Sequence, residues 1–167
     1  FGIVYGLSAF GLSRQLKIYP KEAKKFIDQY FALYKKVKVY MEKTVAEAKE
    51  VGYTQTMMNR KRYLPDLKSQ NRQLREAAGR VAINSPVQGS AADLIKLAMI
   101  RLAQKIRKKK LKSRMILQVH DELVFECPEE EEQEMRALVK KEMEGVVALK
   151  VPLVVDMGWG KNWNTAH

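Results

Sequence analysis

Hydrophobic and polar positions repeat at two different periods along this chain, and these periods predict its elements. Apolar residues recur every three to four positions across residues 20–52, which predicts one long helix or two. The same spacing predicts a helix over 71–84, which Pro86 ends because a proline disfavours helical geometry in the residue before it. A further helix is predicted over 90–108, and an amphipathic helix follows Pro128.

Alternation at period two predicts an antiparallel hairpin near the middle of the second half of the chain. Met115, Leu117 and Val119 are expected to face one way, and the apolar pattern resumes with Leu123 and Phe125 on the returning strand.

Shorter elements are predicted elsewhere. Extended pieces are expected over 53–57 and 63–64, with Asn59 in a left-handed turn between them. A last strand is predicted over 151–157. The opening residues 1–6 carry aromatic side chains four positions apart and then a glycine, which predicts the end of a helix.

An aromatic stripe follows the helical spacing of the first long helical segment. Its members are Phe26, Tyr30, Phe31 and Tyr34. Such a stripe can be a platform on which bases stack, but at this spacing a packed core face is the more common structure. We therefore assign the stripe to packing.

The net charge favours a polyanionic partner. The chain has 31 Lys and Arg against 19 Asp and Glu, a formal charge of +12, and phosphate contacts would release counterions. A solvated basic surface is the alternative. Basic residues crowd 35–38, 60–62 and 107–114, and the basic loop at 60–62 can contact phosphate. Six glutamates gather over 126–134, and we expect them to face away from the polyanion.

The cysteine content and the apolar runs indicate the compartment. Cys127 is the only cysteine, so the chain forms no intramolecular disulfide or zinc cluster, which fits a reducing intracellular setting. No apolar run approaches the roughly 20 residues of a membrane span, and no signal peptide opens the chain. We expect a soluble cytoplasmic protein. Because the first residue is Phe1 rather than Met, we also expect the chain to be the downstream part of a longer protein.

Two adjacent acids stand at the predicted hairpin turn. Asp121 and Glu122 occupy a position where tight turns usually carry Asn-Gly, Asp-Gly or Gly-X, so turn geometry does not explain them. Adjacent carboxylates on a rigid hairpin can share a divalent cation such as Mg²⁺. A solvated polar turn is the alternative interpretation.

Three separated stretches carry a resemblance. They are FGIVYG at residues 1–6, RVAINSPVQGSAADLIK at 80–96 and QVHDELVFE at 118–126. Together and in this order they resemble the C-terminal part of the polymerase region of family A DNA polymerases, the DNA polymerase I group. The resemblance covers essentially the whole chain. It implies an α+β fold, with helices packed on an antiparallel palm-type sheet, residues 1–70 in the C-terminal part of the fingers and 71–167 in the distal palm.

The resemblance also implies the chemistry of the hairpin. Asp121 resembles the palm aspartate that holds two catalytic Mg²⁺ ions, and Glu122 resembles an auxiliary carboxylate beside it. Two metals can activate a primer 3′-hydroxyl and stabilise the departing pyrophosphate. His120 is expected near the primer terminus.

The same resemblance implies contacts to DNA and to the incoming dNTP. Phe1 is expected against the sugar of the nucleotide, where a Phe implies discrimination against dideoxynucleotides, and Tyr5 is expected to stack at the templating position. Contacts to the primer–template duplex are expected from Arg75, Arg80, Asn84 and Gln88. Arg80 and Asn84 are four residues apart on the predicted helix, so both can reach one groove. Minor-groove contacts suit an enzyme that tests pairing without reading sequence.

Two departures from the family pattern bear on function. Asn59-Arg60-Lys61-Arg62 stands where many relatives have Gly-Arg-Arg-Arg, which keeps the charge, and we expect little effect. The fingers motif also needs an Arg and a Lys upstream of Phe1, and the metal site needs a second aspartate, neither of which is in this sequence. We therefore expect the chain alone not to polymerise DNA and to need an upstream segment carrying the thumb and proximal palm.

Two other classes of protein share some of these features. The His-Asp metal phosphohydrolases need several histidine ligands, whereas this sequence has only two histidines. A basic DNA-binding module without catalysis is the non-enzymatic alternative. Adjacent acids beside a polyanion weigh against that module, because they repel phosphate unless a cation intervenes.

Overall fold

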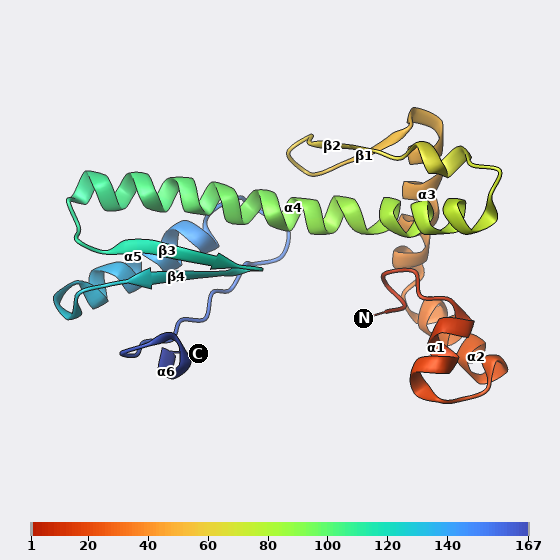
Figure 1. Cartoon of the computed structure of the whole chain (residues 1–167), viewed down its shortest axis with the longest axis horizontal. Helices are drawn as coiled ribbons and strands as arrows, with labels where there is room; N and C mark the ends of the chain where they lie inside the picture. The colour runs from red at the N-terminus through yellow and green to blue at the C-terminus, as the bar shows by residue number, and fades with distance from the viewer. Residues whose placement is uncertain (1, 167) are drawn as a thin grey trace. The chain divides into compact units, whose positions relative to one another are not determined.

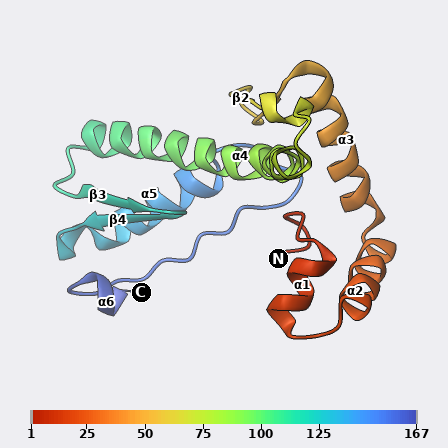
Figure 2. The ribbon, with the colours of Figure 1, turned by 45° about the vertical axis from the view of Figure 1, so that its right-hand side comes forward.

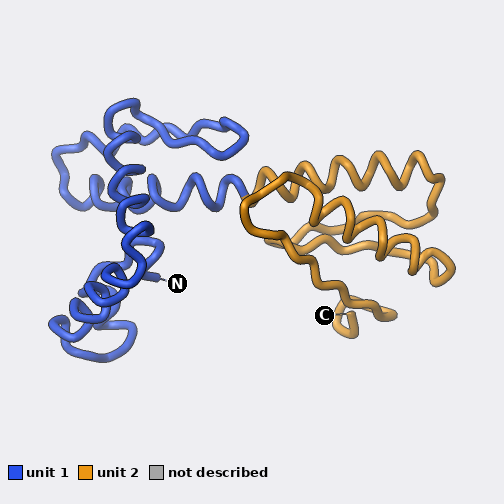
Figure 3. The backbone as a smooth tube through the Cα atoms, turned by 180° about the vertical axis from the view of Figure 1, so that it is seen from behind, with its two compact units in different colours: residues 1–90 blue, residues 91–167 orange. Residues whose placement is uncertain are grey.

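The computed structural model describes residues 2–166, so the predictions made for Phe1 lie outside the described residues. The chain divides into two compact units, residues 1–90 (unit 1) and 91–167 (unit 2), shown in Figure 3. Each unit is described by itself below. The fingers and palm assignments, with their boundary at residue 70, stay predictions.

Unit 1 begins its regular structure with three helices, α1 (Ala9–Leu16), α2 (Pro20–Leu33) and α3 (Lys35–Val51) (Figures 1 and 2). The Ser8 hydroxyl caps α1 by accepting from the Gly11 N–H at 3.1 Å. Of the two possibilities that the sequence left open, the structure has two helices, because Tyr34 leaves helical geometry with φ −105° and ψ 57°. Figure 2 shows α1 lying beside α2.

The start of the chain has the hydrogen bonds of a helix end, with Gly6 as the stop that the sequence predicted. Residues 2–6 form a turn, in which the N–H of Tyr5 donates to the Gly2 carbonyl and that of Gly6 to the Ile3 carbonyl, both at 3.1 Å. The Leu7 N–H closes the turn by donating to the same Gly2 oxygen at 2.9 Å. With Gly6 at φ 82°, the Gly6 and Leu7 bonds together form the Schellman motif, in which a left-handed glycine ends a helix.

The aromatic stripe is less buried than predicted. Ala23 is fully buried in α2, but Phe26 is 55% exposed and Tyr34 is 49% exposed. The Tyr30 ring contacts the rings of both Phe31 and Tyr34, at centroid distances of 5.4 and 4.9 Å. The rings of Tyr30, Phe31 and Tyr34 therefore pack on one another. The assignment to a core face is wrong for Phe26 and Tyr34.

A short hairpin follows α3. Its strands β1 (Tyr53–Gln55) and β2 (Lys61–Tyr63) pair antiparallel. The sequence predicted extended pieces over 53–57 and 63–64, so the first strand is shorter than predicted and the second begins two residues earlier. Asn59 adopts the predicted left-handed conformation, with φ 63°. The chain then passes through the 3₁₀ turn η1 (Pro65–Lys68), and a small core closes unit 1. Its buried members are Ala48, Leu64, Leu67, Ala78 and Ala82.

One continuous helix, α4 (Arg72–Lys109), replaces the two helices that the sequence predicted. Pro86 lies inside it and cannot donate to the carbonyl of Ala82, a loss that costs about 3 kcal/mol in an ordinary helix. One turn further on, the Ser90 hydroxyl donates to the Pro86 carbonyl at 2.5 Å, a bond that does not replace the one lost at Ala82. Apolar residues on both sides of the proline are buried, among them Ala82 at 0% and Leu102 at 0% exposure, so packing holds the helix together.

Unit 2 contains the predicted hairpin, formed by β3 (Arg114–Val119) and β4 (Glu122–Glu126). A β-bulge interrupts the register between Met115 and Leu117. One extra residue reverses the side-chain alternation beyond it. For this reason Leu117 is 43% exposed, and the prediction that it shares a face with Met115 is wrong.

Helix α5 (Glu132–Glu144), preceded by the 3₁₀ turn η2 (Glu129–Glu131), supplies the other half of the core of unit 2. Its apolar side faces inward as predicted. The buried residues of this core come from α4 and α5 and are Leu102, Ile106, Met135, Leu138 and Val139, and the hairpin contributes half-buried side chains around them.

The predicted last strand over 151–157 is wrong. The segment is extended but pairs with no strand among the described residues, and Val154 is 75% exposed. Side chains hold it instead, since the Val155 N–H donates to Glu144 Oε1 at 3.1 Å and Arg136 Nη1 donates to the Met157 carbonyl at 3.4 Å. A short helix, α6 (Trp163–Ala166), ends the described chain.

The fold class is α+β, as predicted: helices dominate, with two small antiparallel two-stranded sheets in the described residues. Within residues 2–166, no helix combines the length and the apolar character that crossing a bilayer requires.

Substitution of Gly89 tests how closely the β1–β2 hairpin packs on α4. A Cβ at Gly89 would lie 2.6 Å from Thr56 Cγ2, and the Thr56 side chain cannot turn away without losing its hydrogen bonds to the N–H groups of Met58 and Arg60. We expect Gly89→Ala to destabilise unit 1 by about 1–3 kcal/mol in a chemical unfolding series.

Gly79 in the same helix is the matched control, because a methyl group added there would meet nothing within 4 Å. Gly79→Ala should leave stability unchanged or raise it by about 0.5–1 kcal/mol. Equal effects of the two substitutions would contradict the close approach of the hairpin.

Candidate functional site

The tip of the β3–β4 hairpin is a two-residue loop made of His120 and Asp121. Val119 pairs with Glu122, so Glu122 is the first residue of β4 and the predicted turn at Asp121 and Glu122 is displaced by one position. His120 has a φ of 52°, a left-handed conformation that hairpin turns need at their first position and that histidine tolerates better than most residues. Gln118 Nε2 holds the loop by donating to the His120 carbonyl at 2.6 Å.

The two carboxylates differ in environment. Asp121 is exposed at the tip, whereas Glu122 is half-buried at the start of β4. Both line a cleft of about 730 Å³ in unit 2, whose apolar walls come from β4, α5 and the C-terminal segment. Asp156 and Trp159 also line this cleft. The hairpin therefore presents two acids at the mouth of a largely apolar cleft.

The acids fit a magnesium site in part. Mg²⁺ takes oxygen ligands and is usually held by one or two carboxylates together with waters and substrate phosphates. Asp121 and Glu122 supply that donor chemistry. Among residues 2–166, no group of three or more His, Cys, Asp or Glu side chains gathers closely enough to hold a metal ion.

A carboxylate at the base of the hairpin fixes the beginning of β3. Glu131 accepts from the N–H groups of Lys112 and Ser113, at 2.8 and 2.9 Å, and from the Ser113 hydroxyl at 2.6 Å. The Ser113 hydroxyl is the main cause of a lowered pKa at Glu131, and the Lys112 N–H adds to it. In the sequence this glutamate is only one member of an acidic run. No local pattern marks its role, because its partners lie 18 and 19 positions away.

The predicted DNA contacts lie on α4 in unit 1, and three of the four share a face. Arg80, Asn84 and Gln88 follow one another at four-residue intervals, which turns each about 40° from the last. Arg80 and Gln88 are exposed, and the Asn84 side-chain oxygen has no hydrogen-bond partner in the described residues. Arg75 lies about 140° from Arg80 around the helix. It bends back to donate to the Ser69 carbonyl at 2.8 Å.

The opening turn packs against this face of α4. A Cβ at Gly6 would lie 3.2 Å from Arg80 Cγ and 3.8 Å from Ile83 Cδ1. Tyr5, the residue before this glycine, is 38% exposed. Unit 1 therefore brings Tyr5 and the Arg80 face close together, while the predicted role of Phe1 falls outside the described residues.

The comparisons with known proteins identify the family. The model of DNA polymerase family A matches residues 1–165. The chain belongs to DNA polymerase family A.

Relatives and a solved structure agree with this membership. DNA polymerase I of Caldicellulosiruptor bescii is 56% identical over 163 residues, and that of Bacillus subtilis is 53% identical over 166 residues. These alignments cover 98% and 99% of this chain but only 19% of each relative, so the chain spans about a fifth of their length. The POL domain of Pol1 from M. smegmatis, solved in complex with DNA primer-template and dNTP, is 51% identical and has a TM-score of 0.97. That match covers 99% of this chain and 29% of the other.

Glu131 gives a prediction about pH. Because its folded-state pKa is lowered below the ordinary 4.5, its contribution to stability is complete above that value and is lost as the pH falls through the lowered pKa. We expect Glu131→Gln to lower the thermal midpoint at pH 7 and to make the midpoint less dependent on pH below 4.5.

Glu130→Gln is the matched control, because within residues 2–166 the Glu130 carboxylate forms an ion pair with the exposed Lys112 ammonium at 3.6 Å and no other. A thermal midpoint measured from about pH 3 to 7 should change little in this control. If Glu131→Gln showed the same acid dependence as the unsubstituted chain, the carboxylate would not hold the hairpin base.

Proposed function

We propose that this chain is the C-terminal fingers and distal palm portion of a DNA-directed DNA polymerase. The reaction is the template-dependent transfer of a nucleotide from dNTP to a primer 3′-hydroxyl. The observation that carries the proposal is the hairpin tip, where Asp121 and Glu122 stand at a two-residue turn in a family A chain. The likeness to a polymerase domain solved with primer-template and dNTP supports it.

Asp121 and Glu122 are the proposed metal ligands of the active site. Bound Mg²⁺ would activate the primer hydroxyl and stabilise the pyrophosphate that leaves. The tight turn orients Asp121, and Glu131 anchors the other end of β3, so the carboxylates are held before substrate arrives. We infer that the second aspartate comes from an upstream segment, together with the thumb, the proximal palm and the start of the fingers motif.

The proposed contacts to DNA come from two sides of α4 and from the hairpin tip. Arg80, Asn84 and Gln88 would donate to acceptors in the minor groove of the primer–template duplex, which every base pair offers. Arg75 would contact the same duplex from a different side of α4. His120 would lie near the primer terminus.

The nucleotide contacts complete the proposal. Tyr5 would stack at the templating position and Phe1 against the sugar of the incoming dNTP. Since the ligands for the triphosphate and the second aspartate lie upstream, the chain alone would be inactive. We propose a bacterial cytoplasmic setting, in association with the nucleoid.

Primer extension tests the role of Asp121. The intact mass of the purified protein is measured first, and extension is then assayed with Mg²⁺ and dNTPs for the chain alone and for the chain with its upstream segment. We expect extension only with the upstream segment, and a loss of at least about 100-fold in Asp121→Asn, because a metal ligand is removed.

Glu126→Gln is the control, because it removes a carboxylate from the far end of β4, opposite Arg114. It should extend primers normally. Extension by the chain alone would overturn the claim that an upstream aspartate is needed. If DNA binding persisted without extension, and without dependence on Mg²⁺, the chain would be a non-catalytic basic DNA-binding module.

Arg80 tests the proposed minor-groove face. Arg80→Ala should weaken binding to a primer–template duplex about 10-fold, with little dependence on its sequence. Arg72→Ala is the control, since it removes the same charge from a side chain that is already paired with Glu76 at 2.7 Å. It should change affinity less than about 2-fold. Affinity is measured by a fluorescence anisotropy titration. If both variants lost affinity equally, binding would depend on the net charge of the chain and not on the Arg80 face.

A further inference from the structure

The end of α4 in unit 2 carries a concentration of positive charge that the proposed function leaves unused. Seven of the ten residues over 105–114 are Lys or Arg, and all seven are exposed. Figure 1 shows this segment entering β3 at the base of the β3–β4 hairpin, opposite its tip. Because β3 has six residues, about 20 Å of strand separates the segment from Asp121. The charge therefore needs an explanation apart from the proposed metal site.

The acids of unit 2 neutralise only part of this charge. Lys109 Nζ pairs with Glu134 Oε1 at 2.5 Å, and Lys112 Nζ pairs with Glu130 Oε1 at 3.6 Å. Four other side chains of the segment make no hydrogen bond or ion pair within residues 2–166. These four, which we call the basic end of α4, are Lys105, Arg107, Lys108 and Lys110.

Helical geometry explains which cations stay unpaired. Lys109 lies about 60° from the buried Ile106 around the axis of α4, toward the core that α5 completes, whereas Lys108 lies about 160° away. The glutamates that follow β4 therefore reach Lys109 and not Lys108. Lys105 and Lys108 are three residues apart, so they are neighbours on the helix surface and repel each other. An anionic partner that covers the basic end would remove this repulsion.

Lys110 stands in a conformation that lysine does not favour. Its N–H donates to the Arg107 carbonyl and the Leu111 N–H donates to the Ile106 carbonyl, both at 3.1 Å, which is the Schellman motif of a helix end. Lys110 has a φ of 56°, and this position of the motif usually holds glycine. The helix dipole favours cations within the last turn, but Lys110 lies beyond it. Its charge therefore indicates a role other than stability.

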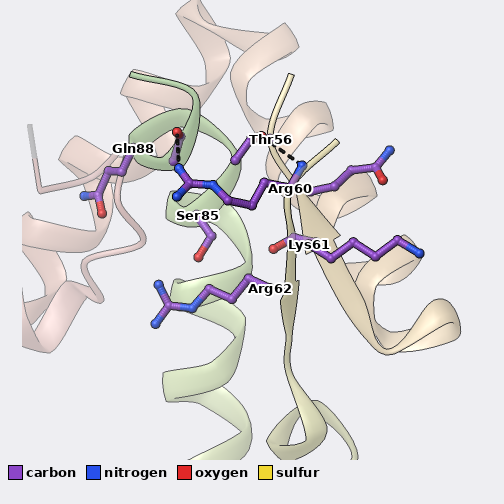
Figure 4. Close-up of a pocket in the computed structure, with 9 residues that line it drawn as sticks. Thr56, Arg60, Lys61, Arg62, Ser85 and Gln88 are labelled. Carbon is purple, nitrogen blue, oxygen red and sulfur yellow. Dashed lines mark hydrogen bonds between the residues drawn. The ribbon is translucent and has the colours of Figure 1, made fainter. Parts of the chain in front are cut away.

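The basic loop of unit 1 differs, because two of its three cations are engaged within that unit. Arg60 Nη2 donates to the Gly89 carbonyl at 3.1 Å, and Figure 4 shows the Arg60 side chain extending toward α4. Lys61 Nζ lies 4.3 Å from the centre of the Tyr53 ring. The basic end of α4 has no comparable internal contacts, so its cations are available to a partner.

The surroundings of the basic end disfavour nucleic acid as that partner. Residues 101–126 contain a single Phe, Tyr or Trp, and this residue, Phe125, packs against the core. No such ring is therefore available to stack on the bases of a single strand. Duplex DNA carries one negative charge per about 1.7 Å of its axis. The acidic run over 129–134 borders the basic end and would repel so dense a charge.

The size of the basic end fits a narrower polyanion. Lys105 and Lys110 are five residues apart, which corresponds to about 8 Å along a helix. Acidic residues at alternate positions of an extended peptide are about 7 Å apart and project to the same side. Two or three carboxylates of such a peptide therefore match the spacing of the unpaired cations.

We propose that the basic end of α4 binds an extended acidic segment of a partner protein. Carboxylates of the segment pair with the ammonium groups of Lys105, Lys108 and Lys110, and the Arg107 guanidinium offers a bidentate contact. Because these pairs are exposed, binding weakens as the salt concentration rises. The inference does not depend on the proposed polymerase function, since it involves neither Asp121 nor the Arg80 face.

Binding of a labelled octaglutamate peptide to the 167-residue chain tests the charge. Affinity is measured by fluorescence anisotropy at low salt. We expect Lys108→Gln to weaken binding about 3-fold, and Lys105→Gln combined with Lys108→Gln to weaken it about 10-fold. Lys140→Gln is the matched control, because Lys140 is an exposed lysine of α5 without an ion pair in the described residues. It should change affinity less than about 1.5-fold. Equal losses in Lys108→Gln and Lys140→Gln would overturn the proposal.

Lys110 gives a second readout, in which binding and stability change in opposite directions. Lys110→Gly should weaken peptide binding about 3-fold. It should also raise the thermal midpoint of the free chain by about 2 °C, since glycine suits the left-handed backbone. Lys110→Gln should weaken binding equally without the gain in stability. Unchanged peptide binding in both variants would contradict a role of Lys110 in holding a partner.

Duplex DNA distinguishes the two classes of polyanion. In the Lys105→Gln and Lys108→Gln double variant, affinity for a labelled duplex should fall less than about 2-fold. If duplex binding fell about 10-fold while peptide binding stayed unchanged, the basic end would be a DNA contact and the assignment to an acidic peptide would be overturned. Arg80→Ala should keep full peptide binding, so failure of the polymerase proposal and failure of this one remain distinguishable.

Discussion

Helix α4 supplies buried side chains to both compact units, and each unit depends on that burial. The helix supplies Ala78 and Ala82 to the core of unit 1, and Leu102 and Ile106 to the core of unit 2. Each core is small, so removing these side chains would leave little apolar surface to offset the loss of chain entropy. Within unit 1 the same helix carries the candidate DNA contacts Arg80, Asn84 and Gln88 on a different side from Ala78 and Ala82, so packing fixes where those contacts stand.

The sequence predicted those elements whose signal is local. The β3–β4 hairpin and α5 follow from alternating and helical apolar patterns, and Asn59 follows from its tolerance of left-handed geometry. The continuity of α4 could not be predicted, because Pro86 gives a strong local stop, while the packing of the helix on both sides of the proline is tertiary. The expected strand over 151–157 failed for a related reason, since a strand needs a neighbouring edge that its own residues do not encode.

The sequence predicted the residues of the candidate site better than their exact geometry. Asp121 stands at the hairpin tip as expected, but the turn is shifted by one residue because the left-handed backbone of His120 has no sequence signal. Arg80, Asn84 and Gln88 share a face as their spacing implies, whereas Arg75 does not. The role of Glu131 depends on contacts between distant segments. Period and composition carry no information about such contacts.

The bulge beside Ile116 has a consequence for how this hairpin tolerates changes in length. Alternation along β4, which places Leu123 and Phe125 against the core, sets the side that Glu122 faces. Six residues of β3 pair with five of β4, so loss of one residue between Met115 and Val119 would remove the bulge and leave regular pairing up to the tip. The strand should therefore accept the deletion of one residue there more readily than an insertion, because an insertion adds a second unpaired residue.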